Sequence, residues 1–250
     1  MLARLLLLLA ALASSPALAD DLPLLGVGAG RAVSAPYYFP GSPAAIYSTR
    51  KVVSAYAGAA LNVRRKSDNA TQDIGFVGAN FDMASAGSFC SGTSCFVTKW
   101  YDQSGAGCDA SQSNTTEQPM LMLINGRAWA AFSVQVLTAC VLALTGDQTV
   151  GAVLMTGDGY DTTFPVGDYD GGAGWTLMEN YTAAKQGIYW SNGAGAFVSS
   201  SGANLLAHAP SRLTATRASG AVNVYINGAS VASVTGQSNT TPSVGFTIGG

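Results

Sequence analysis

The chain has 250 residues, with 12 Lys and Arg against 14 Asp and Glu, and charged residues make up only 10% of it. This near-neutral balance lacks the basic excess that neutralises phosphates, which argues against a nucleic-acid-binding protein. A single His excludes a multi-histidine metal site, and no cofactor is expected. The 30 Gly residues and the scarcity of Glu and Lys disfavour long surface helices, so an all-β extracellular domain is expected.

The N-terminus has the pattern of a secretory signal. Arg4 precedes an apolar run over residues 5–13, and Ala17-Leu18-Ala19 forms an A-x-A cleavage site. The apolar run is too short to cross roughly 30 Å of hydrocarbon as a helix, which argues against a membrane anchor. We therefore predict a signal peptide over residues 1–19, a single β-domain over residues 20–250, and a secreted or periplasmic location without a membrane partner after cleavage.

Apolar and β-branched runs between turn residues predict the secondary structure. An apolar face at Val52, Val53 and Tyr56 favours a helix over residues 48–57. Strands are then predicted over residues 95–101, 128–136, 149–156, 175–179, 187–190, 212–217, 221–226, 230–235 and 244–248.

The strongest local signal is a hairpin at Asn227-Gly228, because both residues of that turn need positive φ and alternating strands flank it. The sum of these elements predicts an all-β fold, a concanavalin-A-like two-sheet antiparallel jelly-roll sandwich. The sequence stops in a strand-to-turn signal at Gly249-Gly250, so we expect a sandwich that is truncated at its C-terminal strands.

Four cysteines are present, and an even number in an oxidising compartment favours disulfides. Cys90 and Cys95 enclose a short Gly/Ser/Thr turn and are predicted to form one bridge. Cys108 and Cys140 then remain as a second pair, with two free thiols as the alternative. Zinc is not expected, because no C-x-x-C pair or second ligand cluster exists.

Two kinds of hydrolytic chemistry can be weighed against these residues. A Ser-His-Asp site would need His208, but the sequence has no G-x-S-x-G elbow. Glycoside hydrolysis needs a pair of carboxylates, and Glu179 follows Trp175 in an apolar strand, where it lies either in a cleft or on the outer face. Aromatic side chains there either stack on a sugar or pack in the core; they are Tyr169, Trp175, Tyr181, Tyr189 and Trp190.

Three stretches carry a resemblance to a known family. They are Tyr47-Ser48-Thr49-Arg50 with residues 63–68, residues 89–95, and Trp100-Tyr101-Asp102-Gln103-Ser104-Gly105. In order and spacing they resemble the catalytic domain of the α-L-arabinofuranosidase B family, glycoside hydrolase family 54. The second half is also similar to laminin-G and concanavalin-A-like lectin domains, which share the jelly-roll sandwich.

The resemblance implies retaining hydrolysis of terminal α-L-arabinofuranosyl residues in arabinan or arabinoxylan. The family nucleophile lies in a Met-Glu-Asn triplet, which matches Met178-Glu179-Asn180, so Glu179 is the candidate nucleophile and Asn180 a substrate contact. Trp175 and Gly250 are further candidate substrate-binding residues. The family has Asp where this chain has Leu177, a second Asn where it has Tyr181, and a sugar-lining Cys-Cys pair where it has Thr162-Thr163.

The family's proton-donating Asp follows a Gly-Gly, and this sequence reaches Gly249-Gly250 and stops. A glycosidase that is inactive as a fragment is therefore expected, and Asp168 or Asp170 would be the in-chain alternatives for the acid. A non-catalytic lectin-like module for carbohydrate binding or surface attachment is the alternative function, and a purely structural domain is a third.

Tyr101-Asp102-Gln103-Ser104-Gly105 is predicted to form a strand-to-turn corner, because Asp102 can accept N–H groups two residues on and Gly105 supplies positive φ. The alternative for Asp102 is a sugar or metal ligand. Asp102, Asp168 and Asp170 are possible calcium ligands, but no ligand loop of recognised spacing is present, and calcium binding is left open.

Overall fold

The computed structural model describes residues 43–142, 146–155, 163–168, 173–182, 185–190, 196–199, 209–237 and 243–249. One helix, α1 (Met83–Phe89), lies within these ranges. The first strands are β1 (Leu61–Arg65), β2 (Thr71–Ile74), β3 (Phe76–Val77), β4 (Asn80–Phe81), β5 (Cys95–Trp100), β6 (Ala110–Ser111), β7 (Met120–Ile124), β8 (Arg127–Ala131) and β9 (Val136–Thr138). The later strands are β10 (Gln148–Leu154), β11 (Thr163–Gly167), β12 (Trp175–Thr182), β13 (Lys185–Trp190), β14 (Ala196–Ser199), β15 (Ser211–Ala218), β16 (Ala221–Ile226), β17 (Ala229–Val234) and β18 (Thr247–Gly249).

Most strands belong to one 12-stranded sheet with the order β14-β13-β12-β11-β18-β9-β6-β5-β1-β2, to which the β7–β8 hairpin is attached through β5. A second sheet has the order β10-β15-β16-β17, and β3 pairs with β4 alone. All the strand pairs of the described residues are antiparallel. The predicted all-β antiparallel sandwich is therefore confirmed.

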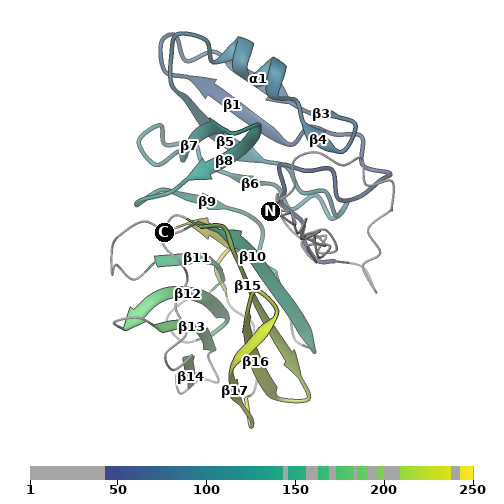
Figure 1. The fold of residues 1–250 in the computed structure, drawn as a ribbon, viewed down its shortest axis with the longest axis vertical. Coiled ribbons are helices and arrows are strands. Elements are labelled where there is room, and N and C mark those ends of the chain that lie inside the picture. The colour runs from purple at the N-terminus through teal and green to yellow at the C-terminus, as the bar shows by residue number, and fades with distance from the viewer. Residues whose placement is uncertain are drawn as a thin grey trace, which may run out of the picture.

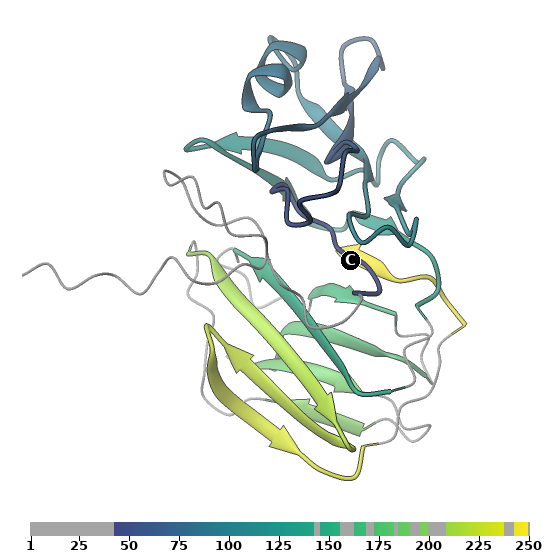
Figure 2. The same ribbon diagram turned by 90° about the vertical axis from the view of Figure 1, so that its right-hand side faces the viewer.

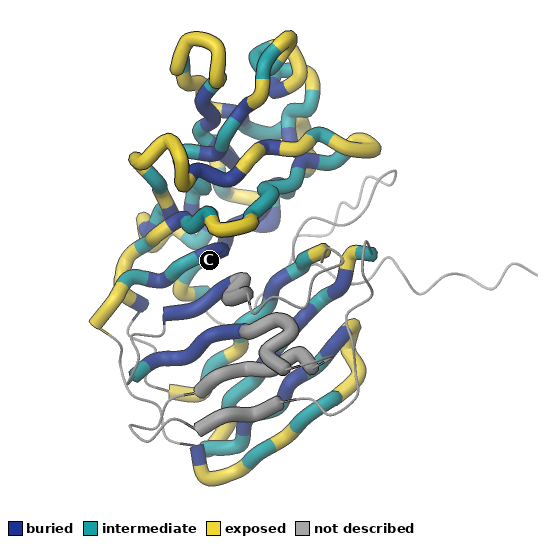
Figure 3. The backbone as a smooth tube through the Cα atoms, turned by 90° about the vertical axis from the view of Figure 1, so that its left-hand side faces the viewer, coloured by how far each residue is buried: buried dark blue, intermediate teal, exposed yellow. Residues whose placement is uncertain are grey.

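The molecule has an upper part, with α1 and β1–β8, and a lower part in which two sheets face each other (Figure 1). Figure 2 shows the sheet of β10 and β15–β17 lying across from β11–β14. Alternating residues of β15 and β16 are buried, which is the period-2 pattern of strands that cover a core on one face. Figure 3 shows buried positions running through the middle strands of both parts.

A row of four aromatic rings connects the two parts of the core. Tyr47 stacks on Phe246 at 6.1 Å and meets Trp100 edge-on at 6.5 Å. Phe246 also packs against Trp175, with 5.9 Å between the ring centroids. Aromatic pairs at such separations contribute about 0.5–1.5 kcal/mol beyond the area that they bury. Because the four rings come from four distant segments, they hold the N-terminal segment, β5, β12 and the approach to β18 together.

The predicted helix over residues 48–57 is wrong. The backbone there is bound by distant partners: the side chain of Gln103 contacts Ser48, Arg50 and Val52, and Lys51 N–H donates to Ala79 at 3.0 Å. These long-range bonds replace the local bonds that a helix needs, so tertiary contacts override the apolar pattern.

The observed helix α1 begins after Asp82, whose carboxylate accepts the backbone N–H of Ser85 at 2.9 Å. Asp followed by a short helical run is a recognisable N-cap signal. A hydrogen bond from the Ser85 hydroxyl at 2.7 Å, together with the bond from the Ser85 backbone N–H, lowers the pKa of Asp82. In the parts of the chain that the structure describes, no helix is long and apolar enough to span a membrane.

The predicted hairpin at Asn227-Gly228 is confirmed: both residues have positive φ, and Ile226 pairs with Ala229. A second hairpin uses the same turn, Asn125-Gly126, between β7 and β8. The run predicted as one strand over residues 128–136 divides into β8 and β9, because the Gln135 side chain accepts the N–H groups of Ser133 and Val134 and forms a turn.

We expect Phe246→Ala to destabilise the fold by about 3–5 kcal/mol, because it removes a ring in contact with both Tyr47 and Trp175. Urea unfolding followed by tryptophan fluorescence measures this free energy. Val244→Ala is the matched control, since Val244 is 38% exposed and should lose far less. Equal losses in the two variants would show that the aromatic row is not a central support.

Candidate active site

The candidate nucleophile lies on β12 (Trp175–Thr182), between β11 and β13. The strand begins in the core: Trp175 is 2% exposed and Leu177 is completely buried. Further along, Glu179 pairs with Thr163 of β11, and Asn180 follows it in the strand. The side chains of Glu179 and Asn180, and all of Gly250, lie outside the described part of the structure, so their roles stay predictions.

The ring of Trp175 belongs to the core, where it packs against Phe246. This is the packing alternative that the sequence left open for the aromatic residues near Glu179. Because so little of the ring is exposed, Trp175 anchors the start of β12, the strand that carries Glu179, in the core. A direct contact between this ring and a sugar stays a prediction.

Two strands have an end at the same end of the sheet as Glu179. Strand β11 pairs with β12 on one side and with β18 on the other, and both pairs are antiparallel. Val166 is opposite Leu177 in β12 and opposite Ile248 in β18. The start of β11 at Thr163 therefore lies at the same end of the sheet as Glu179 and as the end of β18 at Gly249.

Thr163, one of the two residues predicted to replace the cysteine pair of the family, is the direct neighbour of Glu179 in the sheet. Thr162 and the side chain of Thr163 lie outside the described part of the structure, so the effect of this replacement on a sugar site stays a prediction.

Asp168 lies at the opposite end of the β11–β12 pair. It is 1% exposed, and its carboxylate accepts the backbone N–H of Trp175 at 3.0 Å. An extended strand advances roughly 3.3 Å per residue, so the step from Thr163 to Asp168 is much longer than a retaining pair allows. Asp168 is therefore a turn residue and not the proton donor for Glu179. Asp170 lies outside the described residues.

The Trp100–Gly105 motif binds several separate segments of the backbone through buried hydrogen bonds. Asp102 is 4% exposed and accepts backbone N–H groups from Ile46 at 2.8 Å, Ser104 at 2.8 Å and Cys108 at 3.2 Å. Ser104 Oγ donates a further bond at 2.7 Å, and Gly105 has a φ of +89°. The predicted corner is confirmed, because these donors occupy both oxygens of the Asp102 carboxylate.

Gln103 extends these bonds to the other motif of the resemblance. It is 1% exposed, its amide donates to the carbonyls of Ser48 and Arg50, and its carbonyl accepts the N–H of Val52 at 2.9 Å. The two motifs are thus bound to each other. Their contribution to the site is to fix the β-sheet frame rather than to contact a substrate.

Both predicted disulfides are confirmed. Cys90–Cys95 closes the loop after α1, and Cys108–Cys140 joins the loop before β6 to the segment after β9. No free cysteine remains in the described ranges. Among the residues that the structure describes, there is also no group of three or more His, Cys, Asp or Glu side chains that could hold a metal ion.

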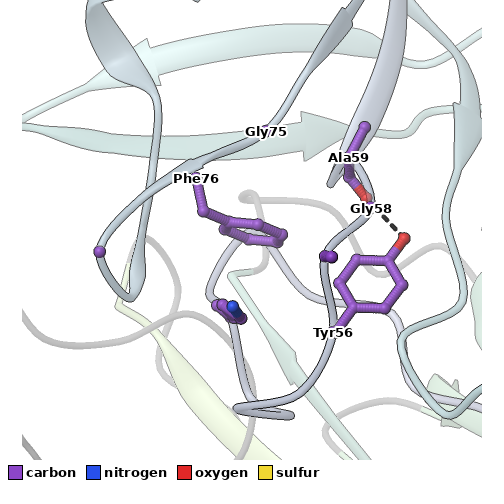
Figure 4. A pocket seen from close by; sticks show the side chains of 8 residues that line it. Tyr56, Gly58, Ala59, Gly75 and Phe76 are labelled. Atoms are coloured by element: carbon purple, nitrogen blue, oxygen red, sulfur yellow. Dashed lines mark hydrogen bonds between the residues drawn. The ribbon is translucent and has the colours of Figure 1, made fainter.

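A hollow in the upper part of the molecule was not expected from the sequence. It has a volume of about 560 Å³ and is lined by the segments 56–59 and 75–78 together with Lys51. In Figure 4 the rings of Tyr56 and Phe76 flank it, with Gly58, Ala59 and Gly75 beside them. The only sequence signal was two short Gly-containing aromatic segments, which are also typical of ordinary turns.

Comparison with known proteins identifies the fold and the family. The solved structures of two arabinofuranosidases match with TM-scores of 0.63 and 0.60 and 16% identity, over 82% of this chain and 54% of theirs. One is a mutant of a family 54 α-L-arabinofuranosidase soaked with 4-nitrophenyl α-L-arabinofuranoside, and the other is complexed with arabinofuranosyl-α-1,2-xylobiose. At this identity they show a shared fold alone, that of an antiparallel β-sandwich.

The sequence comparisons are more specific. The model of the family "Alpha-L-arabinofuranosidase B, catalytic" matches residues 37–178. A probable α-L-arabinofuranosidase B of Aspergillus terreus is 31% identical over 67% of this chain, and an α-L-arabinofuranosidase of Hypocrea jecorina is 30% identical over 64%. The chain belongs to the α-L-arabinofuranosidase B catalytic-domain family. It spans about a third of the length of these curated relatives, 33% and 31% respectively.

We expect Asp102→Asn to destabilise the fold by about 1–3 kcal/mol, because one oxygen that accepts N–H bonds becomes an NH₂ group facing other donors. Thermal unfolding measures the loss. Asp68→Asn is the control: Asp68 is exposed and pairs with Arg65 in water, so its substitution should leave the unfolding temperature close to that of the wild type. If Asp102→Asn unfolded like the wild type but lost glycan affinity, Asp102 would be a ligand-binding residue.

Proposed function

We propose that this chain is an α-L-arabinofuranosidase domain that hydrolyses terminal α-L-arabinofuranosyl residues of arabinan or arabinoxylan with retention of configuration. Membership of the family supports the reaction type. The single observation that carries the site is the register of β12, which places Glu179 at the sheet end where β11 begins and β18 ends.

The reaction assigns Glu179 the role of nucleophile. Its carboxylate attacks the anomeric carbon, the bond to the leaving oxygen breaks as that oxygen takes a proton, and water then hydrolyses the glycosyl ester. Asn180 is proposed as a substrate contact. The family carries its proton donor after a Gly-Gly pair, and Gly249, the first glycine of the matching pair, ends β18 at this same end of the sheet.

Natural arabinosides have poor leaving groups, so their cleavage depends on the proton donor, whose assistance typically gives about 10²–10⁴-fold. A 4-nitrophenyl leaving group needs little protonation. It therefore reports on the nucleophile independently of the proton donor, and it is the substrate of choice for testing Glu179.

We expect Glu179→Gln to abolish release of 4-nitrophenol from 4-nitrophenyl α-L-arabinofuranoside. The matched control is Glu117→Gln, which changes the only other Glu of the sequence. Glu117 is exposed, and its carboxylate accepts bonds from Gln112 and Asn114 far from β12 in the chain, so turnover should persist. Rapid quenching and mass spectrometry of the wild type should find one arabinosyl group on the peptide that contains Glu179.

The alternative is a lectin-like domain that binds arabinose-containing glycans without cleaving them. This alternative is favoured by Thr162-Thr163, which stand where the family has its pocket cysteines. The residue that pairs with Glu179 in the neighbouring strand therefore differs from that of the family. Binding of the glycoside with no turnover, equal in the wild type and in Glu179→Gln, would establish this alternative and refute the nucleophile.

We further propose export to an oxidising compartment after removal of residues 1–19, which the two disulfides support. When the full sequence is expressed in a secreting host, the mature protein should begin at Asp20. Intact-mass measurement of the protein from the medium or periplasm gives the cleavage site. Recovery of the uncleaved chain in the cytoplasm would contradict the proposal.

A further inference from the structure

The hollow beside Tyr56 and Phe76 lies in the upper part of the molecule, whereas Glu179 lies on β12 in the lower part (Figures 1 and 4). Tyr56 and Phe76 meet edge to face, with their ring centroids 6.4 Å apart and an interplanar angle of 78°. Both residues are half-buried, and the adjacent Val77 is 65% exposed. Part of each residue is therefore open to solvent, while Phe76 also packs against the core.

The rings are held in place. Tyr56 O–H donates to the carbonyl of Ala59 at 2.8 Å, which closes the turn and fixes the ring orientation. A Cβ at Gly58 would lie 2.5 Å from the Tyr56 hydroxyl oxygen, so only Gly allows the chain to pass under the ring. An ordered aromatic ring loses little side-chain entropy when a ligand packs on it.

Two of the glycines that line the hollow leave open space, and one charged side chain lines it as well. A Cβ added at Gly75 or Gly78 would meet no atom within 4 Å. Lys51 is the single charged residue among the described lining residues.

We propose that this hollow is a polysaccharide-binding site separate from the site at Glu179, and that it takes a segment of a pentose-containing glycan. Sugar rings have apolar C–H faces that pack on aromatic rings, and hydroxyl groups that bond to ammonium, carboxylate and peptide groups. The two aromatic rings, Lys51 and the peptide groups of the lining combine both kinds of partner. The glycan class rests on the proposed function, whereas the location rests on the geometry alone.

Gly75→Leu tests the site by filling it. Gly75 has no positive φ and nothing within 4 Å of an added Cβ, so the side chain enters the hollow without backbone strain. Gly87→Leu is the matched control, because Gly87 also has open space around its Cβ but lies on the exposed face of α1. Phe76→Ala removes one ring and serves as a second variant if Gly75→Leu fails to fold.

Affinity electrophoresis of the whole chain through gels that contain soluble arabinoxylan measures the binding. The wild type and Gly87→Leu should be retarded equally, whereas Gly75→Leu and Phe76→Ala should bind about tenfold more weakly, a typical effect at the centre of an interface. Hydrolysis of 4-nitrophenyl α-L-arabinofuranoside should be unchanged in all three variants. Glu179→Gln should lose hydrolysis but keep its retardation, which separates failure of this proposal from failure of the nucleophile.

Equal retardation of Gly75→Leu and the wild type would overturn the proposal, as would a wild type that migrates the same with and without arabinoxylan. Loss of retardation in Glu179→Gln alone would also overturn it, because the polymer would then be held at β12.

Discussion

The strand β18 (Thr247–Gly249) is hydrogen-bonded along both edges, to β9 on one side and to β11 on the other. It is the only link between these two strands in the order of the large sheet. Just before it, Phe246 packs between Tyr47 and Trp175 and exchanges backbone bonds with Ala139 and Cys140. The frame that carries β12, and with it Glu179, therefore depends on a segment at the far end of the sequence.

The two motifs that carry the family resemblance, Tyr47–Arg50 and Trp100–Gly105, also hold distant segments of this frame together. Asp102 and Gln103 are buried and bind the backbone of Ile46, Ser48 and Val52, so the motif at Trp100–Gly105 and the motif at Tyr47–Arg50 form one hydrogen-bonded unit. A buried carboxylate whose oxygens accept several N–H bonds is a structural anchor. The stretches that carry the resemblance to this family thus include residues that hold the sheet together, away from the strand that carries the candidate nucleophile.

The candidate site could be predicted in part. Glu179 follows from the Met-Glu-Asn triplet and the need for a carboxylate, but its neighbours do not follow from the sequence. Thr163 lies beside it only because β11 and β12 pair with a register shift, and Asp168 is excluded only because the same register places it at the other end. The hollow at Tyr56 and Phe76 had no usable signal, since aromatic residues next to glycines are also typical of plain turns.

By itself, the sequence determined the features that depend on neighbouring residues or on composition: the all-β class, the turn at Asn227-Gly228, the bridge between Cys90 and Cys95, and the corner at Asp102. Tertiary structure decided everything that joins distant segments. It replaced the expected helix over residues 48–57 with an irregular segment that includes a turn at Val53, because the side chain of Gln103 bonds to that backbone. It also placed β18 between β9 and β11, because strand pairing follows the burial of a shared core and not the order of the chain.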